Sequence, residues 1–287
     1  MSAPTALTLS LCNELLAQDG LSLDAQCEVA KALGYEGLEL SPGTLAPEPH
    51  TLGADTLDTM RQTVERHGLR ITGLHWLLAP YPAASIFDPS QWDKTKAILF
   101  ALIDQCARLG GSVLVHGSPS SRHLPDGVSM VDALSISAEF FRSIAARAEE
   151  RGVTYAIEPL SRAETAFINT VDEAALLVEM VGSPAFKTMI DTSAAGQTER
   201  VPVAELIRRW VPTGMISHIQ VNDTNRGAPG TGDDPFHAIV AALDDVGWDK
   251  PVAVEPFKTV VNGVATAAIG AATLRAHFAA CAASRAR

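Results

Sequence analysis

Short apolar runs rich in β-branched residues alternate along the chain with longer segments in which apolar residues recur every three or four positions. The runs are typical of buried strands and the longer segments of amphipathic helices, and their alternation is typical of a parallel sheet with crossover helices. We predict eight strands, over residues 6–11, 37–40, 71–77, 112–116, 154–160, 187–192, 216–222 and 251–257. Their starts lie about 30 to 40 residues apart, the length of one strand, one helix and two loops.

Helical segments fill the intervals between these strands. They are predicted over residues 24–33, 56–66, 91–109, 131–151, 171–181, 202–210, 234–246 and 265–283. Four are followed by a glycine suited to the left-handed residue that ends a helix, namely Gly34, Gly68, Gly110 and Gly152. Eight strand and helix units without a linker predict an α/β protein that is a single (β/α)8 TIM barrel, with one domain over residues 1–287. An open doubly wound sheet is the alternative, but neither of the usual phosphate-binding glycine motifs occurs in the sequence.

Composition and charge indicate a globular protein and disfavour two classes of partner. Apolar residues make up 47% and charged residues 19% of the 287 residues, as in a globular protein with a large core. The formal net charge of −11 disfavours both nucleic acid and an anionic membrane surface as partners.

The spacing of the cysteines and the lengths of the apolar runs indicate the cellular location of the protein. The four cysteines include no Cys-x-x-Cys pair, so we expect buried thiols in a reducing compartment. No Lys or Arg occurs among the first twenty residues, and the longest apolar run, 263–274, is too short to span a bilayer. We therefore expect a cytoplasmic protein with no membrane association.

The later predicted strands carry carboxylates near their ends. Glu158, Asp191 and Glu255 each follow buried apolar residues of the fifth, sixth and eighth strands. A barrel places its active site at the C-terminal ends of the strands, so these side chains should converge there. Converging buried carboxylates repel one another unless a cation joins them, which predicts a divalent metal site. For each acid taken alone, a structural role is the alternative.

The seventh strand supplies a further candidate ligand. Its alternation places His218, Gln220 and Asn222 on one face, which should point into the barrel. A set of carboxylates with an amide or imidazole suits Mn²⁺ or Mg²⁺ better than zinc. The pattern leaves open whether His218 or Gln220 contacts the metal.

Four segments together resemble a known family. The sequences AIEPL, MIDTSAAG, HIQVND and AVEPF are similar to the fifth to eighth strand motifs of the xylose-isomerase-like barrels. This superfamily includes ketose 3-epimerases, hydroxypyruvate isomerase and, more remotely, endonuclease IV. The resemblance extends over essentially the whole chain and implies a small-molecule sugar substrate and a homodimer or homotetramer.

The resemblance also assigns roles to residues. It implies that Mn²⁺ or Mg²⁺ is held by four ligands, Glu158, Asp191, Gln220 and Glu255. Glu158 and Glu255 would be the catalytic acid and base. Arg226 lies six residues after Gln220, the spacing between the ligand His and a substrate-binding Arg in the epimerases, while Gln at the ligand position is similar to hydroxypyruvate isomerase. Glu164 matches a substrate-contacting Glu of the epimerases.

One position departs from the epimerase pattern. Ala194 stands where the epimerases have a substrate-binding His. Side chains that should reach the barrel mouth are candidates to replace it or to contact substrate elsewhere, namely His75, Trp76, His116 and His218. A packed wall of the cavity is the alternative for them. For the polar loop at residues 118–122 we expect a solvated turn, with anion binding as the alternative.

These features predict a metal-dependent isomerase or epimerase that acts on a ketose, an aldose or a related hydroxycarbonyl compound through an enediolate. A dehydratase of the same superfamily would use the same chemistry and expel a hydroxyl group. A sugar-binding or C-glycoside-processing subunit is a further alternative. A nuclease similar to endonuclease IV is disfavoured, because the eight histidines do not supply a three-zinc cluster at these strand ends.

Overall fold

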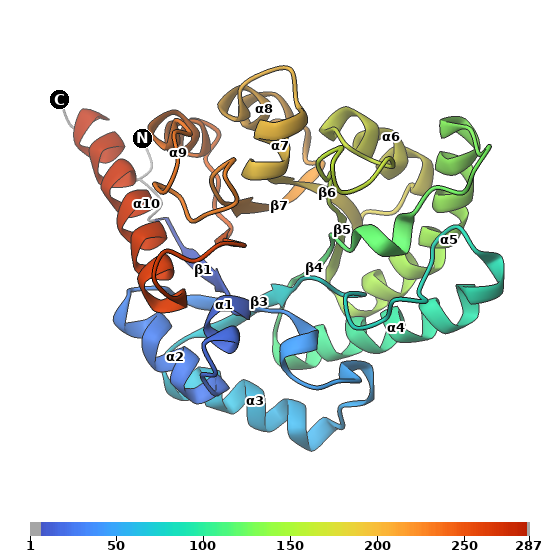
Figure 1. The fold of residues 1–287 in the computed structure, drawn as a ribbon, viewed down its shortest axis with the longest axis horizontal. Coiled ribbons are helices and arrows are strands. Elements are labelled where there is room, and N and C mark those ends of the chain that lie inside the picture. The colour runs from blue at the N-terminus through green and yellow to red at the C-terminus, as the bar shows by residue number, and fades with distance from the viewer. Residues whose placement is uncertain (1–6, 286–287) are drawn as a thin grey trace.

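The computed structural model describes residues 7–285 and contains a closed barrel of eight parallel strands surrounded by helices (Figure 1). Each strand pairs with the next, and β8 pairs with β1. The predicted (β/α)8 barrel is therefore confirmed. Residue 6, the predicted start of the first strand, lies outside the described residues.

All eight predicted strands form. Their bounds are β1 Leu9–Cys12, β2 Gly37–Leu40, β3 Arg70–Leu74, β4 Val113–His116, β5 Thr154–Ile157, β6 Phe186–Asp191, β7 Ile216–Val221 and β8 Val252–Val254. The predictions for β3, β5 and β8 run three residues too far, because the chain leaves the sheet at the barrel mouth after Leu74, Ile157 and Val254. Those extra residues include His75, Glu158 and Glu255.

The eight predicted helices also form. They are α2 Leu23–Ala32, α3 Ala54–Arg66, α4 Trp92–Leu109, α5 Met130–Arg151, α6 Val171–Val181, α8 Val203–Trp210, α9 Phe236–Asp245 and α10 Gly263–Arg285. The predicted glycines Gly34, Gly68, Gly110 and Gly152 all have positive φ, between 65° and 83°. Two short helices were not predicted, α1 Glu14–Gln18 and α7 Thr192–Thr198, because each is too short to show a helical period.

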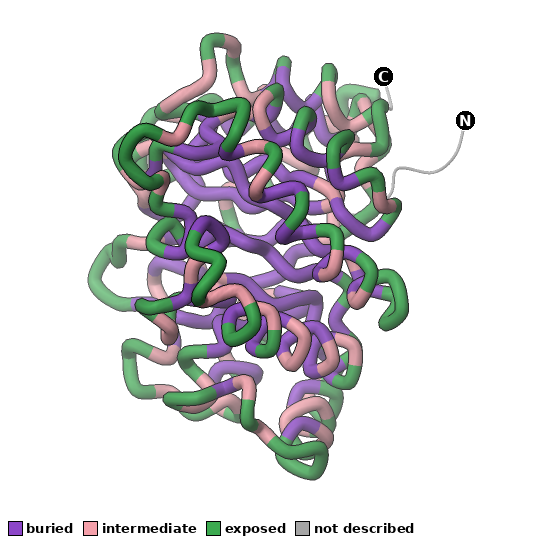
Figure 2. Tube along the Cα trace, turned by 90° about the vertical axis from the view of Figure 1, so that its right-hand side faces the viewer, coloured by how far each residue is buried: buried purple, intermediate pink, exposed green. Residues whose placement is uncertain are grey.

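The main apolar core lies between the strands and the surrounding helices, and Figure 2 shows buried residues through the centre of the molecule. A second, small apolar cluster consists of Val113, Val115, Ala156 and Met189. Buried polar side chains also belong to the barrel strands, such as Ser10, whose hydroxyl lies 2.7 Å from that of Thr72. This distribution leaves buried polar groups on the strands of the barrel.

The cysteines and the C-terminal helix differ in part from expectation. Cys12, Cys27 and Cys106 are buried free thiols as predicted, whereas Cys281 is partly exposed on α10. The predicted apolar run, residues 263–274, is by itself too short to span a bilayer, but it is part of the 23-residue helix α10. An 18-residue window of α10 has a mean hydropathy of 1.3, which makes this helix long and apolar enough to cross a membrane. Ala267, Ala271 and Leu274 of α10 are buried in the protein, and 28% of the apolar window is buried in all.

A prediction follows from the close approach of β3 and β4. A Cβ atom at Gly73 would overlap the carbonyl oxygen of Val113 and lie 2.7 Å from its Cγ1. We expect Gly73→Ala to lower the free energy of unfolding by about 1–3 kcal/mol, measured by urea denaturation. In the control Gly53→Ala, the added Cβ meets nothing within 4 Å, so a smaller loss is expected. Equal losses in the two variants would contradict this account of the strand contact.

Candidate active site

Three carboxylates meet at the C-terminal end of the barrel. Asp191 is the last residue of β6, and Glu158 and Glu255 directly follow β5 and β8. All three are buried, and one oxygen from each lies within 4.8 Å of the others. The structure thus brings together the three acids whose convergence was predicted from their strand positions.

Backbone and amide groups hold Asp191 and Glu255 in place. One oxygen of Asp191 accepts a hydrogen bond from the N–H of Ala194 at 2.7 Å and so caps α7. The Asn222 amide donates to the other Asp191 oxygen and to the carbonyl of Glu255, both at 2.9 Å. Asn222 therefore ties β6 to the end of β8, a positioning role that its strand pattern alone did not reveal.

Glu158 is positioned by a glycine and a buried arginine. A Cβ atom at Gly117 would overlap the Glu158 carboxylate, so the glycine leaves room for this side chain in the orientation observed. The guanidinium of Arg122 donates to the Glu158 carbonyl at 2.7 Å and is fully buried. These two residues after β4 thereby determine where the carboxylate of β5 lies.

The electrostatics of the three acids favour a bound cation. Burial raises the pKa of Asp191 to about 7. Burial also raises the pKa of Glu158 and of Glu255 well above the usual range, and the neighbouring carboxylates raise both further. In the absence of a cation these groups bind protons more tightly than free carboxyl groups do, and a divalent cation would compete with those protons.

Gln220 and His218, the two candidate ligands on the seventh strand, lie at different depths in the barrel. Gln220 pairs with Asp191 across the strands and donates through its amide to Glu39 at 2.8 Å, while its buried side-chain oxygen has no hydrogen-bond partner among the described residues. His218 lies deeper, with Nε2 2.8 Å from the other Glu39 oxygen in an ion-pair contact that lacks hydrogen-bond geometry. Burial raises the pKa of Glu39, but His218 and His75 outweigh it and hold that pKa below its usual value.

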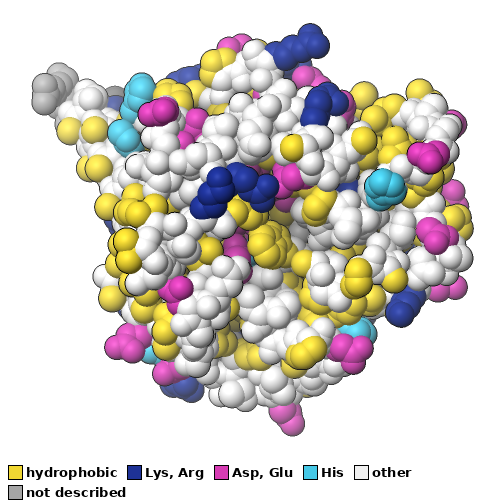
Figure 3. Space-filling view, in the orientation of Figure 1, with side chains coloured by type: hydrophobic (Ala, Val, Ile, Leu, Met, Phe, Trp, Pro, Cys, Tyr) yellow, Lys and Arg dark blue, Asp and Glu magenta, His cyan; other side chains and the backbone are white. Residues whose placement is uncertain are grey.

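A cavity of about 330 Å³ opens above Glu158 at the barrel mouth. The Trp76 and Phe257 rings stack in its wall at 5.8 Å, and the Arg226 guanidinium lies 4.4 Å from the centre of the Phe257 ring. Arg226 also lies 3.3 Å from the carboxylate of Glu164. Figure 3 shows apolar and acidic side chains in the hollow at this face, with basic side chains beside it. Trp76, Glu164 and Arg226 thus reach the cavity as predicted.

The other predicted substrate contacts do not line this cavity. His116 is fully buried, with its ring nitrogens 2.7 Å from the Tyr155 hydroxyl and 3.0 Å from the Ser121 hydroxyl. Burial, together with Arg122, lowers the pKa of His116 to about 3. His116 is therefore packed inside the protein against Tyr155 and Ser121, and it does not line this cavity. His75 and His218 are also buried, and both lie against carboxylates inside the barrel.

The loop at residues 118–122 is not the solvated turn that was expected. Ser118, Ser121 and Arg122 are buried, and only the residues between them are exposed. The loop is drawn inward because its polar groups satisfy others in the protein, including the Ile86 N–H, which donates to the Ser121 carbonyl at 2.8 Å. Part of the loop then forms one wall of the cavity.

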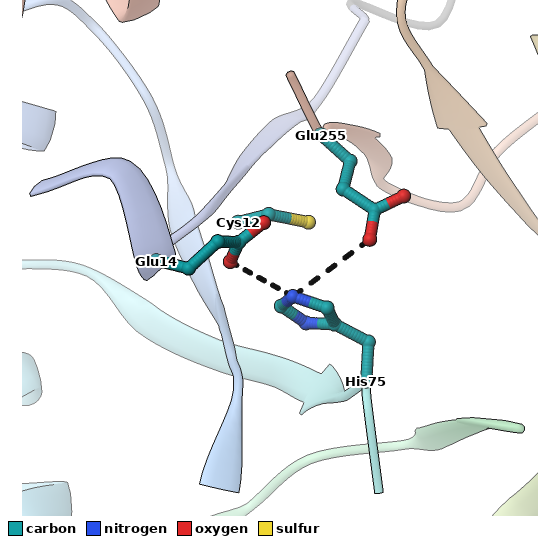
Figure 4. Close-up of side chains that lie close together, drawn as sticks. All are labelled: Cys12, Glu14, His75 and Glu255. Carbon is teal, nitrogen blue, oxygen red and sulfur yellow. Dashed lines mark hydrogen bonds and ion pairs between the residues drawn. The ribbon is translucent and has the colours of Figure 1, made fainter. Parts of the chain in front are cut away.

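Several site residues come from the first two strands and were not predicted. Cys12 ends β1, Glu14 begins α1, and Glu39 lies in β2, and all three are buried near the carboxylates (Figure 4 shows Cys12 and Glu14). Cys12 and Glu39 stand near the ends of correctly predicted strands, so the same strand-end rule would have identified them. Glu14 lies in a helix that the sequence pattern did not show.

The chain is similar in sequence to a known family and to characterised enzymes of it. A model of the family described as "Xylose isomerase-like TIM barrel" matches residues 27–277. The chain is 34% identical to the D-psicose 3-epimerase of Agrobacterium fabrum over 119 residues. That match covers 42% of this chain and 40% of the relative, so less than half of either protein is aligned.

Solved structures share the fold over nearly the whole chain. An L-ribulose 3-epimerase superposes with a TM-score of 0.76 and 20% identity, covering 98% of this chain and 97% of that one. The 3-keto-D-glucoside 4-epimerase of E. coli has a TM-score of 0.74 and 17% identity, covering 88% and 94%. At these identities the similarity shows a common fold.

The raised pKa of Asp191 predicts how the metal-free protein depends on pH. Between the ordinary Asp value of about 3.9 and about 7, folded Asp191 holds a proton that the unfolded chain releases. The free energy of unfolding should therefore fall as pH rises through this interval, by up to several kcal/mol from this group. Urea denaturation in chelator at several pH values measures the slope. Asp191→Asn should have a shallower slope, and an unchanged slope would contradict the raised pKa.

Proposed function

This chain belongs to the xylose isomerase-like TIM barrel family, and on that premise we propose that it is a divalent-metal-dependent isomerase or epimerase of a small sugar or related hydroxycarbonyl compound. The observation that carries the proposal is the convergence of Glu158, Asp191 and Glu255 beneath a cavity sized for one small molecule. The similarity to a D-psicose 3-epimerase favours a ketose as substrate.

The donor set fits a hard divalent cation. Glu158, Asp191 and Glu255 offer carboxylate oxygens, and Gln220 adds a buried amide oxygen that has no hydrogen-bond partner among the described residues. Four oxygen donors suit Mn²⁺ or Mg²⁺. We assign Gln220 as the fourth ligand, because it stands opposite Asp191 on the neighbouring strand, whereas His218 stands opposite Met189, deeper in the barrel.

Glu158 and Glu255 are placed to move the proton. When bound, the cation would polarise the substrate carbonyl and favour the enediolate. One glutamate removes the proton from the carbon next to the carbonyl, and the other returns a proton to the opposite face or to the neighbouring carbon. Each glutamate places one oxygen within 4.8 Å of the other and of Asp191, so both lie beside the proposed cation position.

The cavity wall indicates how the substrate is held. Arg226 and Glu164 are paired at 3.3 Å and together offer donors and acceptors to sugar hydroxyl groups. The stacked Trp76 and Phe257 rings supply an apolar surface for the carbon side of a sugar. Arg226 is the one cationic side chain among the described residues that line the cavity, and Glu164 already neutralises it. We therefore favour a neutral sugar over a sugar phosphate.

Replacing either proton-transfer group should remove turnover while keeping the fold. We expect Glu158→Gln and Glu255→Gln each to lower the exchange rate by about 10²–10⁴-fold, the usual contribution of a positioned acid or base. Proton NMR in D₂O, with a panel of ketoses, aldoses, hydroxypyruvate and inososes, measures deuterium incorporation and identifies the product. Near-normal exchange in both variants would remove the assignment.

Two controls accompany this experiment. Glu65→Gln changes an exposed glutamate on α3 and should retain the wild-type rate. Chelation should abolish exchange, and added Mn²⁺ should restore it. A dehydrated product would reassign the protein as a lyase, and absence of exchange with every compound tested would favour a sugar-binding subunit.

Arg226 is expected to act on binding more than on chemistry. We expect Arg226→Gln to raise KM at least about 10-fold with a smaller change in kcat, because hydrogen bonds from a charged group contribute about 1.5–3 kcal/mol. Arg162→Gln is the matched control, since Arg162 is exposed and pairs with Glu173 outside the cavity. An unchanged KM in Arg226→Gln would show that this side chain does not hold substrate.

A further inference from the structure

A second cluster of potential ligands lies on the other side of Glu255. Cys12, Glu14 and His75 come from the end of β1, the start of α1 and the residue after β3. One ligand atom from each of these residues and from Glu255 lies within 4.8 Å of the others. Figure 4 shows the four side chains directed toward a common space, and all four are buried.

Contacts within the cluster leave ligand atoms free. One Glu14 oxygen lies 2.8 Å from Nε2 of His75, and one Glu255 oxygen lies 3.9 Å from the same nitrogen. The other oxygens of Glu14 and Glu255 are buried and have no hydrogen-bond partner in residues 7–285. Burying an unpaired carboxylate oxygen is costly, so an ion pair between His75 and Glu14 accounts for only part of the arrangement.

A carboxylate also lies beside the second nitrogen of the imidazole. Nδ1 of His75 lies 3.5 Å from a Glu39 oxygen and makes no hydrogen bond to any described residue. In metal sites the non-ligating nitrogen of a histidine usually faces a carboxylate or carbonyl, which aims the other nitrogen at the ion. The same Glu39 accepts a hydrogen bond from Gln220, the fourth ligand assigned to the first site.

We propose that Cys12, Glu14, His75 and Glu255 form a second divalent-cation site, which shares Glu255 with the site at Glu158 and Asp191. Its sulfur, nitrogen and oxygen donors suit Zn²⁺, in contrast to the all-oxygen donors of the first site. The Cys12 thiol loses its proton to solvent when the ion binds. The two oxygens of Glu255 serve one site each.

Cobalt(II) tests the proposal, because it replaces zinc and gives a near-ultraviolet charge-transfer band when a thiolate binds it. We expect the wild-type protein, titrated under reducing conditions, to bind two Co²⁺ per chain and to show this band. Cys12→Ala should lose the band and one Co²⁺. Cys281→Ser, which removes the partly exposed thiol, should keep both. Absence of the band in the wild type, or its persistence in Cys12→Ala, would overturn the proposal.

A further variant separates this site from the first one. Asp191→Asn should weaken the first site and leave the thiolate band in place, so loss of the proposed activity and loss of the second site are distinguishable. Glu14→Gln, nearly identical in size, should weaken Co²⁺ binding with the band at least 10-fold, and it decides the question if Cys12→Ala does not fold. A Glu14→Gln variant with wild-type affinity would contradict the role of Glu14.

Discussion

Repulsion among buried carboxylates is the constraint that organises the interior of this barrel. Five carboxylic acids are buried in the barrel, namely Glu14, Glu39, Glu158, Asp191 and Glu255. A buried carboxyl group must keep its proton, pair with a cationic side chain or bind a metal ion. Glu39 is stabilised by His218 and His75, and Glu14 lies against His75. Glu158, Asp191 and Glu255 lack an equivalent set of cationic partners, which is why burial raises the pKa of each.

Residues around Glu158, Asp191 and Glu255 fix the positions of these three acids. Gly117 leaves space for the Glu158 carboxylate, Arg122 holds its backbone, and Asn222 links Asp191 to the Glu255 carbonyl. These contacts join β4, β5, β6, β7 and the end of β8. The acids are thus pre-positioned by the strands, while residues on the following loops, such as Trp76 and Arg226, line the cavity.

The sequence predicted correctly those side chains whose position depends on a single strand. Glu158, Asp191 and Glu255 were identified because every strand of a barrel delivers its C-terminal residue to the same end. The choice between His218 and Gln220 could not be made in this way, since both lie on the same face of β7. Only the barrel pairing places Gln220 opposite Asp191 and His218 one step deeper, opposite Met189, and this is the basis on which we propose Gln220 as the ligand.

The sequence by itself determined the barrel, its eight strands and the three carboxylates at its mouth, because hydrophobic periodicity and strand order are local properties of the chain. Only the tertiary structure decided that His116 is part of a packed wall, that Arg122 is buried, and that Cys12 and Glu14 approach His75 and Glu255. These outcomes depend on distances between residues on different strands and loops. Periodicity specifies the face on which a side chain lies, but closure of the barrel determines which side chain lies across from it.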